Sequence, residues 1–447
     1  MLASAPRTQT QWLTLLNSDT KNYSLLHPSM KILLLNQAFW PDVVASAQQL
    51  TMLARRLSER GHQVTVIASA RGYDDATASF PRRERWHSID IVRISSVSAG
   101  KKHRWQRTIN FASFLFACAA RLISMPRQDV VIALTSPPLI SWLGSLFIGI
   151  KGGELIFWPL DLNPDEAIAA GWLKESSFTA RFLSRLLNSS MARAKTIIAL
   201  DEFMKERIVA KGISKDKIDV IAPAPDDAVS YDEEGREAFR RAHNIADKFV
   251  LMYAGNHSPC HPLDTLLLAA HKLKHREEIV FLFVGGGSEV EKVQSFAGTH
   301  DLRNVRHLPY QPKAKLSALL SAADLHVVVM GEGFGGIVHP SKIYNILKVR
   351  APFLFIGPEA CFISDIVAAG PRELVAMRAQ HGQIEEVVTF ISSLADRHLK
   401  GRSRAIASGY DFSINSGFSR FIAHIEAVNP QSSPARFGTV GTSADIV

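Results

Sequence analysis

Short, continuous apolar runs recur along this chain, and longer stretches with helical spacing separate them. Such runs are typical of strands in a parallel sheet that helices cover on both faces. Apolar residues three and four positions apart, as between about Ser46 and Arg60, predict the covering helices. In the first half of the chain the expected strands are Met30–Leu35, Gln63–Ala68, Asp129–Leu134, Leu155–Trp158 and Thr196–Leu200.

The alternation restarts after an acidic and irregular stretch, Ala222 to about Asn244. Two such series predict an α/β fold of two doubly wound, Rossmann-like domains, with a ligand cleft at the carboxyl ends of the strands. The expected strands of the second series are Phe249–Tyr253, Val280–Val284, Asp324–Met330 and Pro352–Ile356. The expected domains are 30–222 and 245–410, with a closing helix at 411–428 and disordered tails at 1–29 and 429–447.

The composition narrows the class of protein. At 447 residues the chain is too long for a single core. Its 47% apolar and 21% charged residues are typical of a globular protein rather than a disordered or membrane-spanning one. Cys118, Cys260 and Cys361 lie far apart without metal-ligand spacing, so we expect unpaired core thiols in a reducing compartment. Residues 1–29 lack the apolar run of a signal peptide.

Positive charge is concentrated in the first half. Residues 30–222 hold 26 Lys and Arg against 17 Asp and Glu, whereas the remainder holds 25 of each. The segment 101–125 joins a basic start to an apolar run too short to span a bilayer, which favours in-plane contact with an anionic membrane over nucleic acid. An ordinary buried helix behind a solvated basic loop is the alternative. The apolar face consists of Phe111, Phe114, Leu115, Cys118, Leu122 and Met125.

The most informative stretch is 330–345, where an apolar strand runs into an acidic, glycine-rich turn. The glycines allow a ligand to approach the backbone closely, and Ser341 opens a helix whose N–H groups suit a phosphate. Glu332 can accept hydrogen bonds from sugar hydroxyls, and Lys342 adds a cation at the helix start. This combination predicts a nucleotide-sugar site, and a plain surface turn is the alternative.

Other features have both a functional and a plain structural explanation. The glycines at 285–287 could hold the base or the diphosphate of a donor, or serve loop geometry alone. His261 could face the donor phosphate or fill the core. Asp161 and Asp165 could orient an acceptor hydroxyl or cap a helix. His103 could bind an acceptor phosphate or lie in a solvated loop.

Several motifs follow one another in an order that resembles a known family. They are Phe39-Trp-Pro-Asp42, Arg60-Gly-His-Gln-Val-Thr-Val66, Thr135-Ser-Pro-Pro138, Asp161-Leu-Asn-Pro-Asp165, Ala170-Gly171, Tyr253-Ala-Gly-Asn256 and the 330–345 segment. From Met30 to about Ala427 the chain resembles family-4 glycosyltransferases of the two-domain GT-B fold. It looks closest to the exopolysaccharide and lipopolysaccharide branch that acts on lipid-linked acceptors.

The chain departs from this family at positions that matter for donor binding. Ala45-Ser46 replaces two glycines that let the backbone of many relatives approach a phosphate. Asn256 and His261 stand where typical members carry Arg and Lys for the diphosphate, and Asn345 stands where a second glutamate binds the ribose. We hypothesise that Lys342 replaces the missing cations over the diphosphate.

The resemblance implies a retaining transfer of a hexosyl or N-acetylhexosaminyl group from a nucleotide-diphosphate sugar to a glycan acceptor. It implies no metal and no cofactor, and we expect a cytoplasmic protein peripheral to the inner face of the plasma membrane. Two rival functions stay open: a nucleotide-sugar epimerase on the same fold, and a non-catalytic nucleotide-sugar binder that serves as a scaffold.

The candidate site residues fall into three groups. The catalytic candidates are Glu332, Lys342 and Asp161. The donor-binding candidates are Asn256, His261, Gly285, Gly286, Gly333, Phe334, Gly335, Ser341 and Asn345. The acceptor and membrane candidates are Lys101, Lys102, His103, Arg104 and Asp165.

Overall fold

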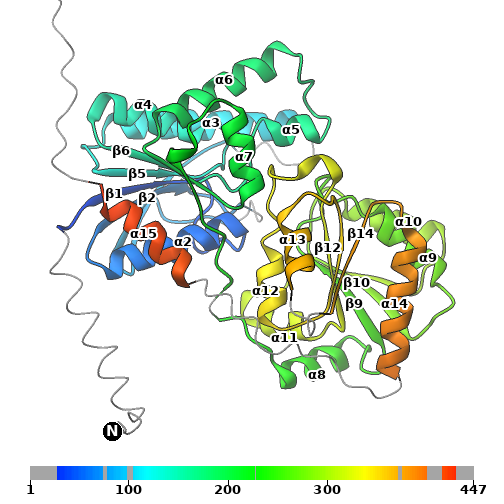
Figure 1. Cartoon of the computed structure of the whole chain (residues 1–447). Helices are drawn as coiled ribbons and strands as arrows, with labels where there is room; N and C mark the ends of the chain where they lie inside the picture. The colour runs from blue at the N-terminus through cyan, green and yellow to red at the C-terminus, as the bar shows by residue number, and fades with distance from the viewer. Residues whose placement is uncertain are drawn as a thin grey trace, which may run out of the picture.

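The protein forms two α/β bodies, each built around a largely parallel sheet (Figure 1). A computed structural model describes residues 28–73, 78–97, 104–226, 228–370, 375–399 and 415–428. Residues 1–27 of the predicted tail 1–29, the whole predicted tail 429–447 and residues 411–414 of the predicted closing helix lie outside these ranges, as do Lys101, Lys102 and His103.

The first sheet has eight strands in the described ranges, in the order β3-β4-β2-β1-β5-β6-β7-β8. All neighbouring strands are parallel except β3 and β4, which are antiparallel. The strands are β1 (Lys31–Leu35), β2 (Gln63–Ser69), β3 (Arg83–Trp86), β4 (Ile89–Ile94), β5 (Val130–Ala133), β6 (Glu154–Phe157), β7 (Thr196–Ala199) and β8 (Ile218–Val220).

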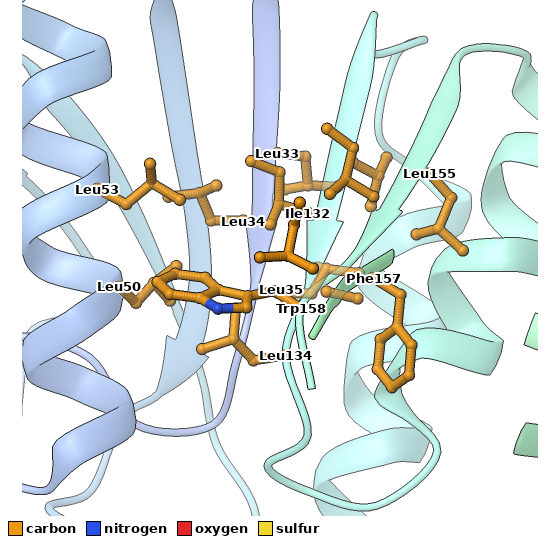
Figure 2. Packing of buried hydrophobic residues seen from close by; sticks show 14 of the residues in the cluster. Leu33, Leu34, Leu35, Leu50, Leu53, Ile132, Leu134, Leu155, Phe157 and Trp158 are labelled. Atoms are coloured by element: carbon orange, nitrogen blue, oxygen red, sulfur yellow. The ribbon is translucent and has the colours of Figure 1, made fainter. Parts of the chain in front are cut away.

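The central strand β1 shows why continuous apolar runs become strands here. Leu33 pairs with Thr65 of β2 on one side and with Val131 of β5 on the other. Helices cover both faces, so Leu33, Leu34 and Leu35 are all fully buried although successive side chains point to opposite faces. Figure 2 shows these leucines in one cluster with Leu50 and Leu53 of helix α2 (Ala45–Glu59), with Phe157, the last residue of β6, and with Trp158, which follows that strand.

Two helical layers enclose the first sheet. In Figure 1, α3, α4 and α6 lie on one side of it, and α2 and α15 (Asn415–Glu426) lie on the other. The helices are α2 (Ala45–Glu59), α3 (Arg104–Ile123), α4 (Ile140–Lys151), α5 (Asp165–Ala169), α6 (Phe178–Arg193) and α7 (Glu202–Ala210).

The apolar face predicted for in-plane membrane contact belongs to the core instead. Phe114, Cys118 and Leu122 of α3, and Met125 just after it, are at most 5% exposed and pack in the first core. The physical reason is that α3 crosses over the sheet between β4 and β5, so one of its faces must cover β-strands. That part of the expectation is wrong, and the structural alternative holds for these side chains.

The second sheet has six parallel strands in the part of the chain that is described, ordered β11-β10-β9-β12-β13-β14. The strands are β9 (Phe249–Ala254), β10 (Ile279–Val284), β11 (Val305–Leu308), β12 (Leu325–Val329), β13 (Phe353–Ile356) and β14 (Ala376–Ala379). The helices around it are α8 (Glu233–Ala242), α9 (Asp264–Lys272), α10 (Val290–Thr299), α11 (Leu316–Ser321), α12 (Lys342–Lys348), α13 (Phe362–Ala369) and α14 (Ile384–Leu399).

The stretch expected to be irregular contains helix α8, which corrects the prediction for residues 222–244. Asp232 caps α8, since its side chain accepts a hydrogen bond from the Gly235 N–H at 2.8 Å. From α8, Arg236 and Arg240 reach Asp324 at 2.5 Å and 2.9 Å, and the three side chains are nearly buried. This ionic cluster fastens α8 to the second body, immediately before strand β12.

The last described helix, α15 (Asn415–Glu426), returns to the first body. Phe421 packs edge-on against Trp158 with a ring-centroid distance of 4.8 Å. Glu426 accepts hydrogen bonds from Arg60 at 3.0 Å. The chain therefore crosses between the two bodies twice, and α15 completes the core of the first.

Candidate functional site

Two loops meet at the carboxyl ends of β9 and β10. Gly285 and Gly287 have φ angles of +133° and +136°, which glycine adopts without strain. A Cβ atom at Gly285 would lie 2.1 Å from the Gly255 carbonyl oxygen, and one at Gly287 would lie 2.1 Å from that of His257. Loop packing thus explains these two glycines, whereas the carbonyl oxygen of Gly286 accepts a hydrogen bond from the His257 N–H at 2.8 Å.

Lys342 lies over these loops. Its Nζ is 3.9 Å from the centroid of the Tyr253 ring, close enough for a cation–π contact. The same atom would be 2.9 Å from a Cβ at Gly255, so only glycine leaves it room there. Nζ is shielded from solvent and has no hydrogen-bond partner in the described ranges. Burial lowers the pKa of Lys342 to about 7.

Two histidines border this lysine. Burial, and then the Lys342 charge, lowers the pKa of His257 to about 4 and that of His261 to about 3. The Nδ1 of His257 is 3.0 Å from the Gly255 carbonyl oxygen, whereas its Nε2 and the Nδ1 of His261 are buried without a partner among described residues. Both rings are neutral at physiological pH. Sequence reasoning missed His257, although it is the residue directly after Asn256 in the loop that follows β9.

A carboxyl pair faces this cluster from the first body. The Asn163 amide donates to Asp161 at 3.2 Å and to Glu166 at 2.8 Å, so one side chain ties both carboxyl groups together. The thiol of Cys260, from the second body, donates to Glu166 at 3.3 Å. Burial, and then the Glu166 charge, raises the pKa of Asp161 to about 7. The fold thus places Asp161 and Glu166 opposite the loop of the second body that contains Cys260 and His261. Glu166 is the second residue, after His257, that the sequence analysis did not single out.

The segment after the glycine-rich turn docks on the first body. Val338 forms an antiparallel bridge with Asp161, and the Ile337 carbonyl oxygen accepts from the Leu162 N–H at 3.0 Å. The Gly335 carbonyl oxygen accepts from Nε of Arg207 at 2.5 Å. Gly335 therefore contributes a backbone contact between the bodies.

His339 links the first body to α12. Its Nδ1 is 2.7 Å from Asp201, and its Nε2 is 2.8 Å from the Tyr344 hydroxyl. Burial lowers the pKa of His339 more than Asp201 raises it, so the ring is neutral. A neutral ring can donate from Nδ1 to Asp201 and accept from Tyr344. Because Tyr344 is in the same turn of helix as Lys342, this chain of bonds fixes α12 relative to the first body.

The glycine-rich turn itself is divided between surface and core. Glu332 and Gly333 are exposed in the short 3-10 turn Glu332–Phe334, and a Cβ at Gly333 would approach Ala169 of α5 at 3.9 Å. Phe334 is 5% exposed and packs in the core of the second body. Glu332 can meet a ligand between the bodies, whereas the Phe334 ring serves packing.

The start of α12 differs in part from the prediction. Helix α12 begins at Lys342 after Ser341, as expected. However, the N–H groups of Ile343 and Tyr344 donate to the carbonyl oxygens of Pro340 and Ser341 at 3.3 Å and 3.2 Å. These two amides are engaged in a tight first turn, so the lysine side chain is the stronger candidate for an anion there.

The remaining candidates have protein partners or exposed positions. The Asn345 side-chain oxygen accepts from the Asp226 N–H at 3.1 Å, which ties the connecting segment to α12. One oxygen of Asp165 pairs with Lys211 at 2.7 Å. Asn256 is exposed at the end of β9, where its carbonyl oxygen accepts from the Tyr253 hydroxyl at 2.8 Å. Arg104 is the first residue of α3.

Two protein-family models match this chain. The family model "Glycosyltransferase Family 4" matches residues 46–228, and "Glycosyl transferases group 1" matches residues 235–339. Together the two models match well over half of the chain. The chain belongs to glycosyltransferase family 4. The putative colanic acid biosynthesis glycosyl transferase WcaI of Escherichia coli is 23% identical over 335 residues, which are 72% of this family-4 chain and 81% of WcaI.

A second curated protein and two solved structures are also similar to this chain. The probable glycosyltransferase WbjE of Pseudomonas aeruginosa is 26% identical over 58% of the chain and 64% of WbjE. Among solved structures, Anabaena HepE with UDP and glucose superposes at a TM-score of 0.66, with 14% identity over 89% of this chain and 99% of HepE. WaaG, a glycosyltransferase involved in lipopolysaccharide biosynthesis, superposes at a TM-score of 0.65, with 15% identity over 89% of this chain and 100% of WaaG. The predicted GT-B fold is confirmed.

Proposed function

We propose that this family-4 glycosyltransferase moves a sugar, with retention of the anomeric configuration, from a nucleotide-diphosphate sugar to a lipid-linked glycan of a cell-surface polysaccharide. One observation carries the proposal: the ammonium group of Lys342 is buried at the strand ends and has no carboxylate partner among the described residues. With a pKa of about 7 this buried amine is only partly charged at neutral pH, and an anion that joins it would stabilise the cationic form. A donor diphosphate is such an anion.

The relatives favour the same substrates. The names of WcaI and WaaG refer to colanic acid and lipopolysaccharide, both of which are polysaccharides of the cell surface. HepE has been crystallised with UDP and with UDP-glucose. We therefore infer a nucleotide sugar as donor and a lipid-linked glycan as acceptor, with hexosyl or N-acetylhexosaminyl transfer as the reaction class.

Residues of both bodies take part in the proposed reaction. The bond between the sugar and the diphosphate breaks, and the cationic form of Lys342 stabilises the charge that develops on the leaving group. Glu332 binds hydroxyl groups of the sugar. Ionised Asp161 accepts a hydrogen bond from the acceptor hydroxyl and holds it toward the anomeric carbon on the face that the diphosphate leaves. The acceptor oxygen forms the new bond to the anomeric carbon, and its proton passes to the departing diphosphate oxygen.

A two-stage experiment tests the proposal. A panel of nucleotide sugars is screened by thermal shift, because a ligand that binds the folded state raises the melting temperature. The stabilising donor is then incubated with lipid-linked acceptors, and the anomeric configuration of the product is read by NMR. Transfer with retention is expected. Binding without turnover would instead favour the scaffold, and donor conversion without an acceptor would favour the epimerase.

Substitution of Asp161 by asparagine tests the acceptor side. We expect the Asp161→Asn variant to lose roughly tenfold in kcat with little change in the donor KM, because orientation of the acceptor is what the carboxylate supplies. At saturating donor, the wild-type kcat should rise with pH through about 7, as Asp161 becomes ionised. A variant with an unchanged rate and an unchanged pH profile would remove Asp161 from the mechanism.

Metal dependence is a separate prediction. Since Lys342 is proposed to neutralise the diphosphate, activity should be unaffected by EDTA and by added Mg²⁺. The measurement is the initial rate of transfer in metal-depleted buffer with each addition. A strict requirement for Mg²⁺ would mean that a cation from solution does the work assigned to the lysine.

We also place the protein at the cytoplasmic face of the plasma membrane, where nucleotide sugars and lipid-linked acceptors meet. None of the described helices has the length and apolarity needed to cross a bilayer. The question is then which surface would bring the enzyme to its acceptor.

A further inference from the structure

Exposed apolar side chains gather on one helical layer of the first body. Eight of the thirteen exposed large apolar side chains in the described ranges belong to α3, α4 or α6. Scattered single cases are ordinary on protein surfaces, but a concentration on neighbouring helices indicates an interaction surface. The eight are Trp105, Ile109, Phe116, Ile123, Leu146, Ile150, Phe178 and Phe182.

Helix α3 carries two apolar stripes. One is the buried stripe that packs on the sheet. The second consists of Trp105, Ile109, Phe116 and Ile123, which recur at spacings of four and seven residues along the outward side and are 59%, 41%, 80% and 76% exposed. A surface helix of a globular protein has one apolar stripe and a polar outer side. The second stripe of α3 therefore has no partner within the described part of this chain.

Helices α4 and α6 extend the same layer. They are joined by Ser141 and Ser190, whose hydroxyl oxygens are 3.0 Å apart, and α4 lies next to α3 (Figure 1). Ile150 at the end of α4 is 80% exposed. Phe178 and Phe182, on the first turns of α6, are 78% and 48% exposed and stack on each other with centroids 6.2 Å apart.

The charged residues in the sequences of these three helices are all basic. The sequences of α3, α4 and α6 contain seven Lys and Arg and no Asp or Glu. Helix α14 of the second body, which is also amphipathic, contains three acidic residues in sixteen. Arg185 and Lys151 are exposed among the apolar side chains. Long basic side chains can keep their charges in the headgroup region while neighbouring rings enter the acyl boundary.

We propose that the outward side of α3, α4 and α6, here called the docking face, binds the surface of an anionic lipid bilayer. This deepens the proposed function, because it brings the first body to the membrane that holds a lipid-linked acceptor. Exposed isoleucine and phenylalanine side chains gain from hydrocarbon and not from the phosphate backbone of a nucleic acid. A second copy of the chain is disfavoured, since the two faces would bring like charges together.

Vesicle binding of matched variants tests the docking face. The full-length chain is mixed with vesicles of phosphatidylcholine alone or with added phosphatidylglycerol, and bound protein is separated by flotation. Wild type should bind the anionic vesicles more tightly, and salt should weaken the binding. The double variant Phe116→Glu with Ile150→Glu should bind about tenfold or more weakly, because it removes two exposed apolar side chains proposed to enter the bilayer and adds two negative charges.

The control is Leu268→Glu, which makes the same change at a side chain of α9 that is 38% exposed on the second body. It should bind like wild type. Equal binding by the double variant, or equal binding to uncharged vesicles, would overturn the proposal. So would a dimer in light scattering that the double variant abolishes, since the face would then join two copies. Donor binding, measured in solution by thermal shift, should not change in the double variant, so a failure of the proposed function is recognised separately.

Discussion

The Lys342→Ala variant is expected to raise the KM for the donor, or the Kd of a nucleotide sugar, by about 10- to 100-fold. The reason is that hydrogen bonds to a charged group are worth roughly 1.5–3 kcal/mol each, and the variant removes the ammonium group proposed to meet the diphosphate. The measurement is titration calorimetry with the nucleotide sugar found by the thermal-shift screen. An unchanged Kd would exclude Lys342 from donor binding.

The pH dependence of donor binding is a second test of the role proposed for Lys342. Burial lowers the pKa of Lys342 to about 7, so above that pH the amine is neutral in the donor-free protein and must take up a proton when the diphosphate binds. The Kd should therefore weaken as pH rises from 7 to 9, by up to about tenfold per pH unit. The diphosphate diester of a nucleotide sugar does not titrate in this range, so the protein is the source of the effect.

Two variants separate this effect from misfolding. Lys342→Arg keeps its charge throughout this range, so its donor affinity should lose the pH dependence. Lys342→Met should bind donor poorly yet melt at a higher temperature than wild type at pH 7 to 8. The sign follows from the lowered pKa: the unfolded chain binds a proton that the folded state excludes between about 7 and 10.5, and that difference favours unfolding. Calorimetry of the three proteins across pH measures both effects, and a lower melting temperature for Lys342→Met would contradict the burial of a neutral amine.

Replacement of Asp324 by alanine is expected to destabilise the protein by about 3–5 kcal/mol, because it leaves two buried guanidinium groups without their counter-charge. The carboxylate accepts from Arg236 and Arg240, and also from the Val250 N–H at 2.8 Å. It thereby joins α8, β9 and β12. The measurement is denaturant unfolding with the m-value compared between proteins.

The dependence of the free energy of unfolding on acidic pH should also change in the Asp324→Ala variant. Burial alone would raise the pKa of Asp324, but Arg240 and Arg236 outweigh it and hold the pKa below its ordinary value of 3.8. A carboxyl group with a lowered folded pKa stabilises the protein above its unfolded pKa and loses that contribution as pH falls through the folded value. The control is Asp247→Ala, whose carboxylate is 81% exposed and 3.7 Å from Lys248, and which should change stability by less than about 0.5 kcal/mol. Equal losses in both variants would contradict the role assigned to the buried cluster.

The site could be predicted only in part, and particular residues show why. Lys342 and His261 were recognisable because they occupy fixed places in a motif or beside a strand end. His257 and Glu166 were not, since nothing in the local pattern distinguishes them from other polar residues after a strand or in a short helix. Their importance arises from neighbours far along the chain: His257 adjoins Lys342, and Glu166 adjoins Cys260.

Phe334 and Gly285 show a different limit of sequence motifs. Both belong to sequence motifs that suggest ligand contact, yet Phe334 fills the core of the second body and Gly285 is explained by the close passage of Gly255. A motif reports that a residue type is needed at a position. Whether a ligand or a neighbouring loop needs it depends on what the fold places within contact distance.

The amino-acid sequence was sufficient to predict the two-body α/β architecture, because continuous apolar runs between helical stretches can be buried only in a parallel sheet covered on both sides. It also determined that a basic first half accompanies a neutral second half. The folded structure was needed to show which of the two apolar stripes of α3 packs on the sheet and which remains exposed, since both stripes have the same helical period. It alone decided that Lys342 is an unpaired amine over Tyr253, because burial and pairing depend on contacts between segments that are distant in the sequence.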